Sequence, residues 1–287
     1  MQETKSACKV EENVRLLIKL KCIEDGQYEM QYHYHLQGFI YNLLKGSEYH
    51  YIHNKVGYKF FCFSNIFPVN SLIIGGYRNL IISSPNEDFI LYLYEQLLHL
   101  VNSHIKIGQM KFIINTIDKF YVKLPIESPV TLITGTPIII RISRERYKVY
   151  GINPTSNYEY VYWRSNHPID LFISNLQYNL TKKYNEYFEL NSSGSTIAES
   201  SEEHKEFSFL LFQNLKFKKQ ISTRLQIKSL NQVIIGTIWE FKFNTTNINR
   251  DLIQFAIESG LGERNSLGFG FMNIIQNNSH QYNKSFN

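Results

Sequence analysis

Apolar residues in the first half of this chain recur with two different periods. The run VRLLIKLKC, residues 14–22, has the length and composition of a strand. In residues 34–45 the apolar positions fall three and four residues apart, which predicts a helix with one apolar stripe. Pro85 stands where helices commonly begin, and residues 87–101 predict a second amphipathic helix. The other apolar runs of this half predict strands over residues 59–63, 72–74, 80–83 and 109–123.

The order strand, helix, strands, helix, strand is that of a ferredoxin-like βαββαβ domain. The segment LPIESP contains two prolines and interrupts this pattern, so we place a domain boundary there. The predicted parts are a loose extension, an N-terminal domain, a C-terminal domain and a flexible tail, over residues 1–13, 14–124, 125–275 and 276–287.

The second half repeats the same kinds of pattern. Helices are predicted over residues 166–188 and 250–259. Residues 207–229 predict two strands of a lysine-bearing hairpin, and residues 191–206 are rich in Ser and Glu and predict a mobile segment. Further strands are predicted over residues 137–142, 233–243 and 269–275. The predicted fold class is α+β, with tandem ferredoxin-like (RRM-like) βαββαβ domains that enclose a cleft.

A glycine-rich segment, GLGERNSLGFGF at residues 260–271, separates the last predicted helix from the last strand. Glycine adopts positive φ at little cost and lets another backbone come close. Successive N–H groups in such a loop can bind an anion, and the guanidinium of Arg264 suits a phosphate. The alternative is that Gly260 caps the helix and the rest is an ordinary turn.

Composition limits the class of protein without deciding its function. The 287 residues are 43% hydrophobic, which is enough for a packed core in one large or two ordinary domains. The 30 Lys and Arg residues exceed the 25 Asp and Glu residues by only five, so the charge permits a nucleic-acid partner without establishing one. The three cysteines form no C-x-x-C pair, which disfavours a disulfide frame or a cysteine zinc site and fits the cytoplasm. No apolar run has membrane-spanning length.

The segment HYIHNKVGYK, residues 50–59, holds side chains suited to cutting RNA without a metal ion. Such cleavage requires deprotonation of a 2′-hydroxyl, protonation of a 5′-oxygen and stabilisation of the phosphorane charge. Histidine suits the proton transfers because its reference pKa is about 6.5, and a lysine ammonium suits the charge. Tyr41 lies on the polar face of the first predicted helix and could contact a phosphate or the attacking hydroxyl. The alternative is that Tyr41 packs at the helix edge with its hydroxyl in water.

The histidine pairs of this region also allow a metal-site interpretation. His50 and His53 form H-x-x-H, but no carboxylate or cysteine cluster nearby completes a ligand set. His33 and His35 fit solvated residues at the start of the helix. We therefore expect no metal ion and no cofactor.

Several of these segments resemble the archaeal CRISPR repeat-RNA endoribonucleases of the RAMP superfamily. The run YHLQGFIYN at residues 34–42 is similar to a helix of that family. Tyr51-Ile-His53 resembles the stretch that ends in the family's catalytic histidine, and Lys59 lies six residues further on. The glycine-rich segment resembles the family's C-terminal signature. The resemblance thus spans both ends of the chain.

The resemblance implies an endoribonuclease that cuts CRISPR repeat RNA independently of metal. Attack by the 2′-hydroxyl would leave a 2′,3′-cyclic phosphate and a 5′-hydroxyl. It implies Tyr41, His53 and Lys59 as the catalytic set, with His50 as the rival histidine. Expected RNA contacts are Gly260, Gly262, Arg264, Gly268 and Gly270 of the loop, extended by Lys216, Lys218, Lys219, Arg224 and Lys228 of the hairpin. The alternative for this hairpin patch is a merely solvated face.

Two other functions remain open at this point. The first is a non-catalytic RNA-binding subunit of a CRISPR effector complex, which would not need all of Tyr41, His53 and Lys59. The second is a general RRM-like RNA-binding protein, which is disfavoured because no clean RNP1-type aromatic motif is present. The expected partners are CRISPR repeat RNA and a CRISPR effector complex, with neither DNA nor a membrane.

Overall fold

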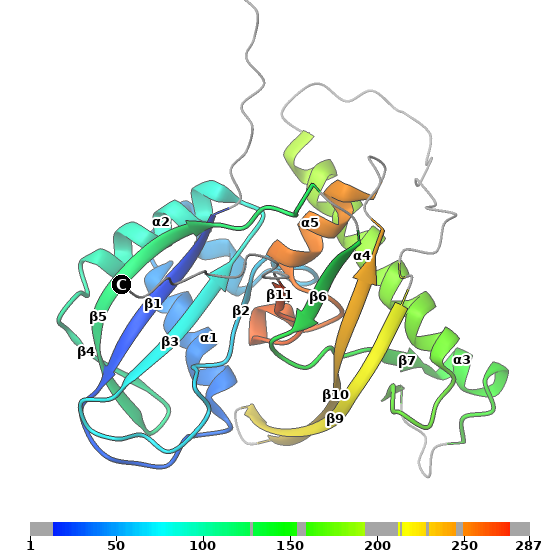
Figure 1. Ribbon diagram of the computed structural model, residues 1–287, viewed down its shortest axis with the longest axis horizontal. Coiled ribbons are helices and arrows are strands. Elements are labelled where there is room, and N and C mark those ends of the chain that lie inside the picture. The colour runs from blue at the N-terminus through cyan, green and yellow to red at the C-terminus, as the bar shows by residue number, and fades with distance from the viewer. Residues whose placement is uncertain are drawn as a thin grey trace, which may run out of the picture.

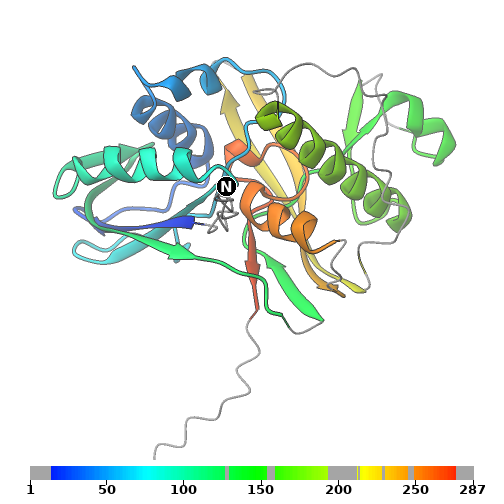
Figure 2. The same cartoon turned by 90° about the horizontal axis from the view of Figure 1, so that it is seen from above.

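Two antiparallel sheets lie side by side in the computed structural model, with helices packed against them (Figure 1). The structure describes residues 14–126, 129–153, 159–192, 212, 214–227, 230–244 and 249–275. Viewed from above, α4 and α5 lie against the C-terminal sheet, and α1 and α2 against the N-terminal one (Figure 2).

The N-terminal sheet has the strand order β2-β3-β1-β5-β4, with every neighbouring pair antiparallel. Without the edge strand β4, this is the order of a βαββαβ ferredoxin-like domain, in which the first strand is central. The elements are β1 (Val14–Cys22), α1 (Tyr32–Leu43), the 3-10 helix η1 (Glu48–His53), β2 (Cys62–Phe63), β3 (Tyr77–Ser83), α2 (Glu87–Leu98), β4 (His104–Ile107) and β5 (Met110–Tyr121).

The C-terminal sheet has the order β11-β6-β10-β9, which is the same topology once one insertion is set aside. The insertion is the small β7–α3–β8 unit between the first strand and the first long helix. The elements are β6 (Val130–Thr134), β7 (Arg141–Ser143), α3 (Arg144–Val149), β8 (Tyr160–Tyr162), α4 (Ile169–Ser192), β9 (Asn214–Ile227), β10 (Leu230–Phe243), α5 (Arg250–Ser259), the 3-10 helix η2 (Asn265–Leu267) and β11 (Met272–Ile274). The predicted tandem ferredoxin-like fold is confirmed.

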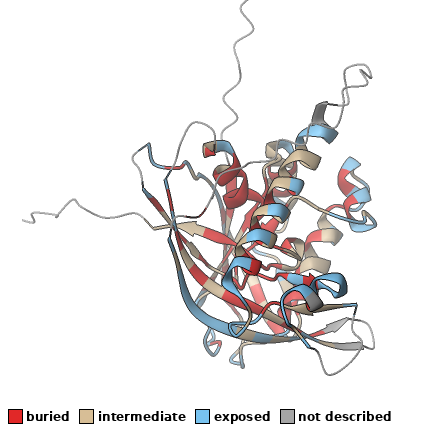
Figure 3. Ribbon diagram, turned by 90° about the vertical axis from the view of Figure 1, so that its right-hand side faces the viewer, coloured by how far each residue is buried: buried red, intermediate tan, exposed pale blue. Residues whose placement is uncertain are grey.

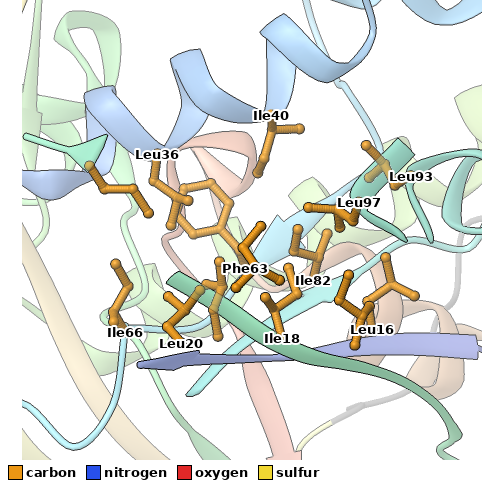
Figure 4. Close-up of a cluster of buried hydrophobic side chains, with 14 of the residues drawn as sticks. Leu16, Ile18, Leu20, Leu36, Ile40, Phe63, Ile66, Ile82, Leu93 and Leu97 are labelled. Carbon is orange, nitrogen blue, oxygen red and sulfur yellow. The ribbon is translucent and has the colours of Figure 1, made fainter. Parts of the chain in front are cut away.

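Successive side chains of β1 point to opposite faces of the sheet, which places Leu16, Ile18 and Leu20 in the core of the N-terminal domain. Leu36 and Ile40 come down from α1 onto this layer (Figure 4). Burying each such side chain contributes about 1.5–3 kcal/mol. Figure 3 shows that buried residues gather on the facing sides of helices and strands. A second core, in the C-terminal domain, includes the stacked rings of α4 and β10.

Several predicted strands differ from the observed ones. Residues 72–74 do not form a strand: only Leu72 makes an isolated bridge, and the chain then turns at Gly75 with φ +78°. The predicted hairpin within residues 207–229 is wrong, because β9 is one long strand that pairs with β10. Its exposed polar residues suggested a turn where the strand continues. The apolar run at 137–142 contributes only the start of β7, and β4, β6 and β8 were not predicted. The mobile segment predicted at 191–206 falls mostly outside the described residues, as do both predicted tails.

Arg15 joins the two domains. This side chain of β1 is only 2% exposed and donates from Nη2 to the carbonyls of Ile257 and Met272, at 2.6 and 2.8 Å. Its Nε donates to Ser83 Oγ at 3.1 Å, and its guanidinium lies 4.6 Å from the centre of the Phe271 ring. Burial lowers the pKa of Arg15 to about 10, so the group stays charged at neutral pH. One cation of the N-terminal domain therefore satisfies two backbone carbonyls of the C-terminal domain.

Candidate active site

Tyr41, His53 and Lys59 meet at one place on the N-terminal domain. Lys59 Nζ donates to the hydroxyl of Tyr41 at 2.8 Å and to the carbonyl of His53 at 2.9 Å. The rings of Tyr41 and His53 are 5.0 Å apart, centre to centre, in an edge-to-face arrangement. Tyr41 comes from α1, His53 ends η1, and Lys59 lies in the loop before β2. The structure thus brings together the three residues predicted as the catalytic set.

Partial burial sets the protonation of this group. It raises the pKa of Tyr41 to about 12, so the phenol keeps its proton at neutral pH. It lowers the pKa of Lys59, because desolvation disfavours the ammonium. The Tyr41 oxygen accepts from Lys59, and the Tyr41 hydroxyl also interacts with the side chain of Ser266.

His53 is exposed, and one ring nitrogen is already engaged. Its Nδ1 lies 2.7 Å from Asn54 Oδ1, an oxygen that can only accept, so Nδ1 carries the hydrogen. Nε2 is then the nitrogen available to exchange a proton with a ligand. The ring of His50 lies 6.5 Å from that of His53, nearly parallel to it. Of the two histidines, His53 is the one in ring contact with Tyr41.

A cleft of about 680 Å³ opens between the two domains beside this group. Lys59 and Gln37 of the N-terminal domain line one side of the cleft. Arg264 and Ser266 of the glycine-rich segment line the opposite side. Helix α4 adds Lys182, among other residues. The volume lies within the 300–1,000 Å³ range usual for ligand sites.

The four glycines of residues 260–271 are buried and packed against protein. A Cβ on Gly268 would lie 2.1 Å from the ring of Phe63 in β2, and one on Gly270 would lie 1.8 Å from the carbonyl of Leu261. All four have positive φ. The amides of Gly260, Gly268 and Gly270 donate to protein carbonyls. Close packing therefore accounts for these glycines, and their part in RNA binding remains a prediction.

The same segment docks on α1 through two side chains. Gln37 donates to the carbonyl of Ser266 at 2.9 Å, and Nδ1 of His33 lies 2.8 Å from the carbonyl of Leu267. Arg264 adopts a left-handed backbone with φ 59° and donates to Gln232 of β10 at 3.3 Å. These contacts fix the turn against the helix that carries Tyr41.

The expectation that His33 is solvated is wrong. The side chain is 4% exposed and stacks on Phe269, with ring centres 4.6 Å apart. Burial lowers the pKa of His33 to about 4. His35, by contrast, is exposed and lies 3.7 Å from Glu29.

The basic residues that were predicted to lie on a hairpin lie instead on the long strand β9, away from the catalytic set. They are exposed, and Lys218 forms an ion pair with Glu240 at 2.6 Å. Lys219 and Arg224 line a second cavity, of about 760 Å³, near the start of α1. Lys228 lies outside the described residues. Of the predicted binding residues, Arg264 thus lines the first cleft, and Lys219 and Arg224 line the second cavity.

Three buried polar residues of the site were not predicted from the sequence: His33, Lys183 and Asn265. His33 precedes Leu36 and Ile40 on the buried stripe of α1, and Lys183 follows Leu176 and Leu180 on that of α4. A polar residue in phase with an apolar stripe is the signal that could have found the first two.

Within the residues that the structure describes, no group of three or more His, Cys, Asp or Glu side chains could hold a metal ion. No helix among them has the length and apolar character to cross a membrane.

Comparison with known proteins assigns the family. Residues 121–274 match the family described as CRISPR associated protein Cas6, C-terminal. A relative from Methanocaldococcus jannaschii, named CRISPR-associated endoribonuclease Cas6 2, is 30% identical over 271 residues, which cover 92% of this chain and 100% of the relative. This chain belongs to the Cas6 family. A Cas6 endoribonuclease from Haloferax mediterranei is 26% identical over 266 residues, which cover 92% of this chain and 94% of that one.

Solved structures share the Cas6 fold. One, titled CRISPR associated protein Cas6, superposes with a TM-score of 0.64 at 23% identity, covering 92% of this chain and 100% of that one. Another, titled as a RAMP protein binding different RNA substrates, gives a TM-score of 0.66 at 21% identity over the same shares. These two structures therefore share the fold of this chain.

Gly268→Ala should destabilise this Cas6 chain by about 3 kcal/mol or more, because the new Cβ meets Phe63 and the φ of +81° disfavours L residues. Denaturant unfolding measures the loss. Gly151→Ala is the matched control, since Gly151 also has positive φ but nothing within 4 Å of its Cβ position. It should cost only about 1 kcal/mol. Equal losses in the two variants would show that close packing at Phe63 is unimportant.

The free energy of unfolding should decrease as the pH falls, because His33 is buried in its neutral form. The imidazole is neutral in the fold, whereas the unfolded chain binds a proton below about pH 6.5, so its contribution is lost as the pH falls from 6.5 towards 4. The slope is at most about 1.4 kcal/mol per pH unit. His33→Gln, which can still donate to the carbonyl of Leu267, should flatten this slope in urea titrations. His35→Gln should leave it nearly unchanged, and the same flattening in both variants would contradict the assignment.

Proposed function

We propose that this chain cuts CRISPR repeat RNA as a metal-independent endoribonuclease. The observation that carries the proposal is the contact of Lys59 with Tyr41, beside His53 and at the edge of a cleft whose other side bears Arg264. The relatives named CRISPR-associated endoribonuclease support the substrate class.

The chemistry is an intramolecular transfer at one phosphate of the RNA. The 2′-oxygen loses its proton and bonds to phosphorus, while the bond from phosphorus to the 5′-oxygen breaks and that oxygen gains a proton. His53, through Nε2, serves as the general acid/base. Tyr41 donates its phenolic hydrogen to the reacting group. The products are a 2′,3′-cyclic phosphate and a 5′-hydroxyl, with no water consumed.

Lys59 stabilises the phosphorane. Its ammonium gains interaction energy as the negative charge grows in the transition state, and partial burial strengthens this interaction. Because Lys59 donates to both the Tyr41 hydroxyl and the His53 carbonyl, it also holds the other two groups in place. Such positioning before binding is a large part of enzymatic rate enhancement.

The RNA backbone is bound by Arg264 and Ser266 across the cleft, and the buried glycines shape the turn that presents them. The exposed cations of β9 extend this track to flanking phosphates, because each phosphate contact adds favourable counterion release.

Repeat RNA should be cut at one position per repeat in the presence of EDTA, because the proposed groups need no metal ion. A 2′-deoxy substitution just upstream of the cut should abolish cleavage and leave binding nearly unchanged. Denaturing gels and filter binding measure the two quantities. Cleavage that vanishes on chelation and returns with Mg²⁺ would overturn the metal-independent mechanism. Cleavage of the deoxy substrate would instead indicate a water nucleophile.

His53→Ala should slow single-turnover cleavage by roughly 10²–10⁴-fold, the scale of losing a positioned acid or base. Lys59→Ala and Tyr41→Phe should also slow this step, and the losses should be non-additive because all three groups act on one transition state.

Tyr34→Phe is the matched control, because Tyr34 lies on the same helix with 39% exposure. It should retain near-normal cleavage. An inactive His50→Ala beside an active His53→Ala would transfer the role to His50. Retained RNA binding without cleavage in the wild type would favour the non-catalytic subunit of an effector complex.

A further inference from the structure

Lys183 is a buried cation beneath the glycine-rich segment. It lies on α4 with 1% exposure. Its Nζ donates to the carbonyl of Gly260 and, at 2.9 Å, to Oδ1 of Asn265. A lysine ammonium can only donate, so it requires the amide oxygen of Asn265 to face α4.

The side chain of Asn265 joins the two ends of the turn by hydrogen bonds. Its Nδ2 donates to the carbonyls of Leu261 and Phe269, at 3.0 and 2.9 Å. With the oxygen held by Lys183, both ends of this 8%-exposed amide are engaged. The neighbours of Asn265 in the chain are Arg264 and Ser266, which line the cleft opposite Lys59.

We propose that Lys183 is a positioning residue of the RNA site, which acts through Asn265 to hold Arg264 and Ser266 towards the cleft. The inference rests on the proposed function and extends it. Lys183 touches no reacting atom. It sets the orientation of the amide from which the turn is built, and it places a positive charge behind the surface that receives phosphate.

This charge depends on pH near neutrality. Burial lowers the pKa of Lys183 to about 7, and only an ionised Cys62 would raise it again. Burial also keeps Cys62 itself neutral by raising its pKa to about 12. An RNA phosphate in the cleft favours the ammonium, so binding should draw a proton onto Lys183. The other ionisable groups around it are Arg15 and Glu258 beside Cys62, and Tyr58, Lys59, Arg141, Tyr178, Lys182, Glu186, Glu263 and Arg264 around the cleft.

The test compares Lys183→Met with Lys182→Met. Lys182 is the preceding residue in the chain and lines the same cleft, but it is exposed and forms no hydrogen bond with Asn265 in the described structure. Both changes are made in a His53→Ala background, which removes the nearby catalytic imidazole. The ligand is repeat RNA with a 2′-deoxy sugar at the cut, and wild-type binding and cleavage of unmodified repeat RNA are measured first to test the proposed function separately.

Calorimetry between pH 6.5 and 8.5, in buffers of different ionisation enthalpy, measures affinity and proton uptake together. The parent should take up a fraction of a proton near pH 7.5. Lys183→Met should weaken binding by about tenfold at pH 6.5, as expected when one charge-assisted hydrogen bond is lost, and should abolish the uptake. Lys182→Met should weaken binding modestly and keep the uptake.

Three results would overturn the proposal: no uptake by the parent, equal uptake in Lys183→Met, or the same loss in Lys182→Met. The last would mean that charge in the cleft matters and the position of the turn does not. Should Lys183→Met fail to fold, Lys183→Arg serves instead, because arginine stays protonated throughout this range. It must then bind without proton uptake, and persistent uptake would reject the assignment.

Discussion

The structure depends on the close packing of a turn that has no space for side chains at its glycines. Residues 260–270 pack between Phe63 on one side and Ile139 on the other. A Cβ atom on Gly268 or Gly262 would clash with these neighbours. This turn is shared by both domains: His33 and Gln37 of α1 contact it from one side, and Lys183 of α4 from the other. The domain interface and one wall of the cleft are therefore the same segment, and neither can change without the other.

The two domains have different parts in the proposed site. The N-terminal domain supplies Tyr41, His53 and Lys59, which contact one another without help from the second domain. The C-terminal domain supplies Arg264 and Ser266, whose positions depend on buried contacts. In the proposed reaction, proton transfer would rely on the exposed His53, whereas phosphate binding would rely on groups held by a packed turn. A fixed cation at a phosphate site gains from rigidity, because it needs no reorganisation as negative charge develops.

Sequence patterns correctly predicted the helices and strands that bury one face and are bounded by polar residues or glycine. The strand Val14–Cys22 and the helix Arg250–Ser259 agree with the prediction at every residue, because each has an unbroken pattern between polar or glycine boundaries. The meeting of Tyr41 with His53 and Lys59 was predicted from a family resemblance, since periodicity says nothing about contacts across a loop. The partners of His33 and Lys183 could not be predicted from the sequence, although their phase with an apolar stripe indicates that they are buried. Composition rules place such residues at the surface, and only tertiary partners far along the chain make their burial favourable.

The contacts of Arg15 have a consequence for the order of events during synthesis. This residue is made before its backbone partners Ile257 and Met272, which follow it by more than 240 positions. At about 5–20 residues per second, the wait is on the order of ten to fifty seconds. During that time the N-terminal sheet can form, but the guanidinium of Arg15 remains hydrated because the carbonyls that it contacts in the folded protein have not yet been made. The joint between the domains can therefore close only after strand β11 has left the ribosome, so a truncated chain lacks the interface and the complete cleft together.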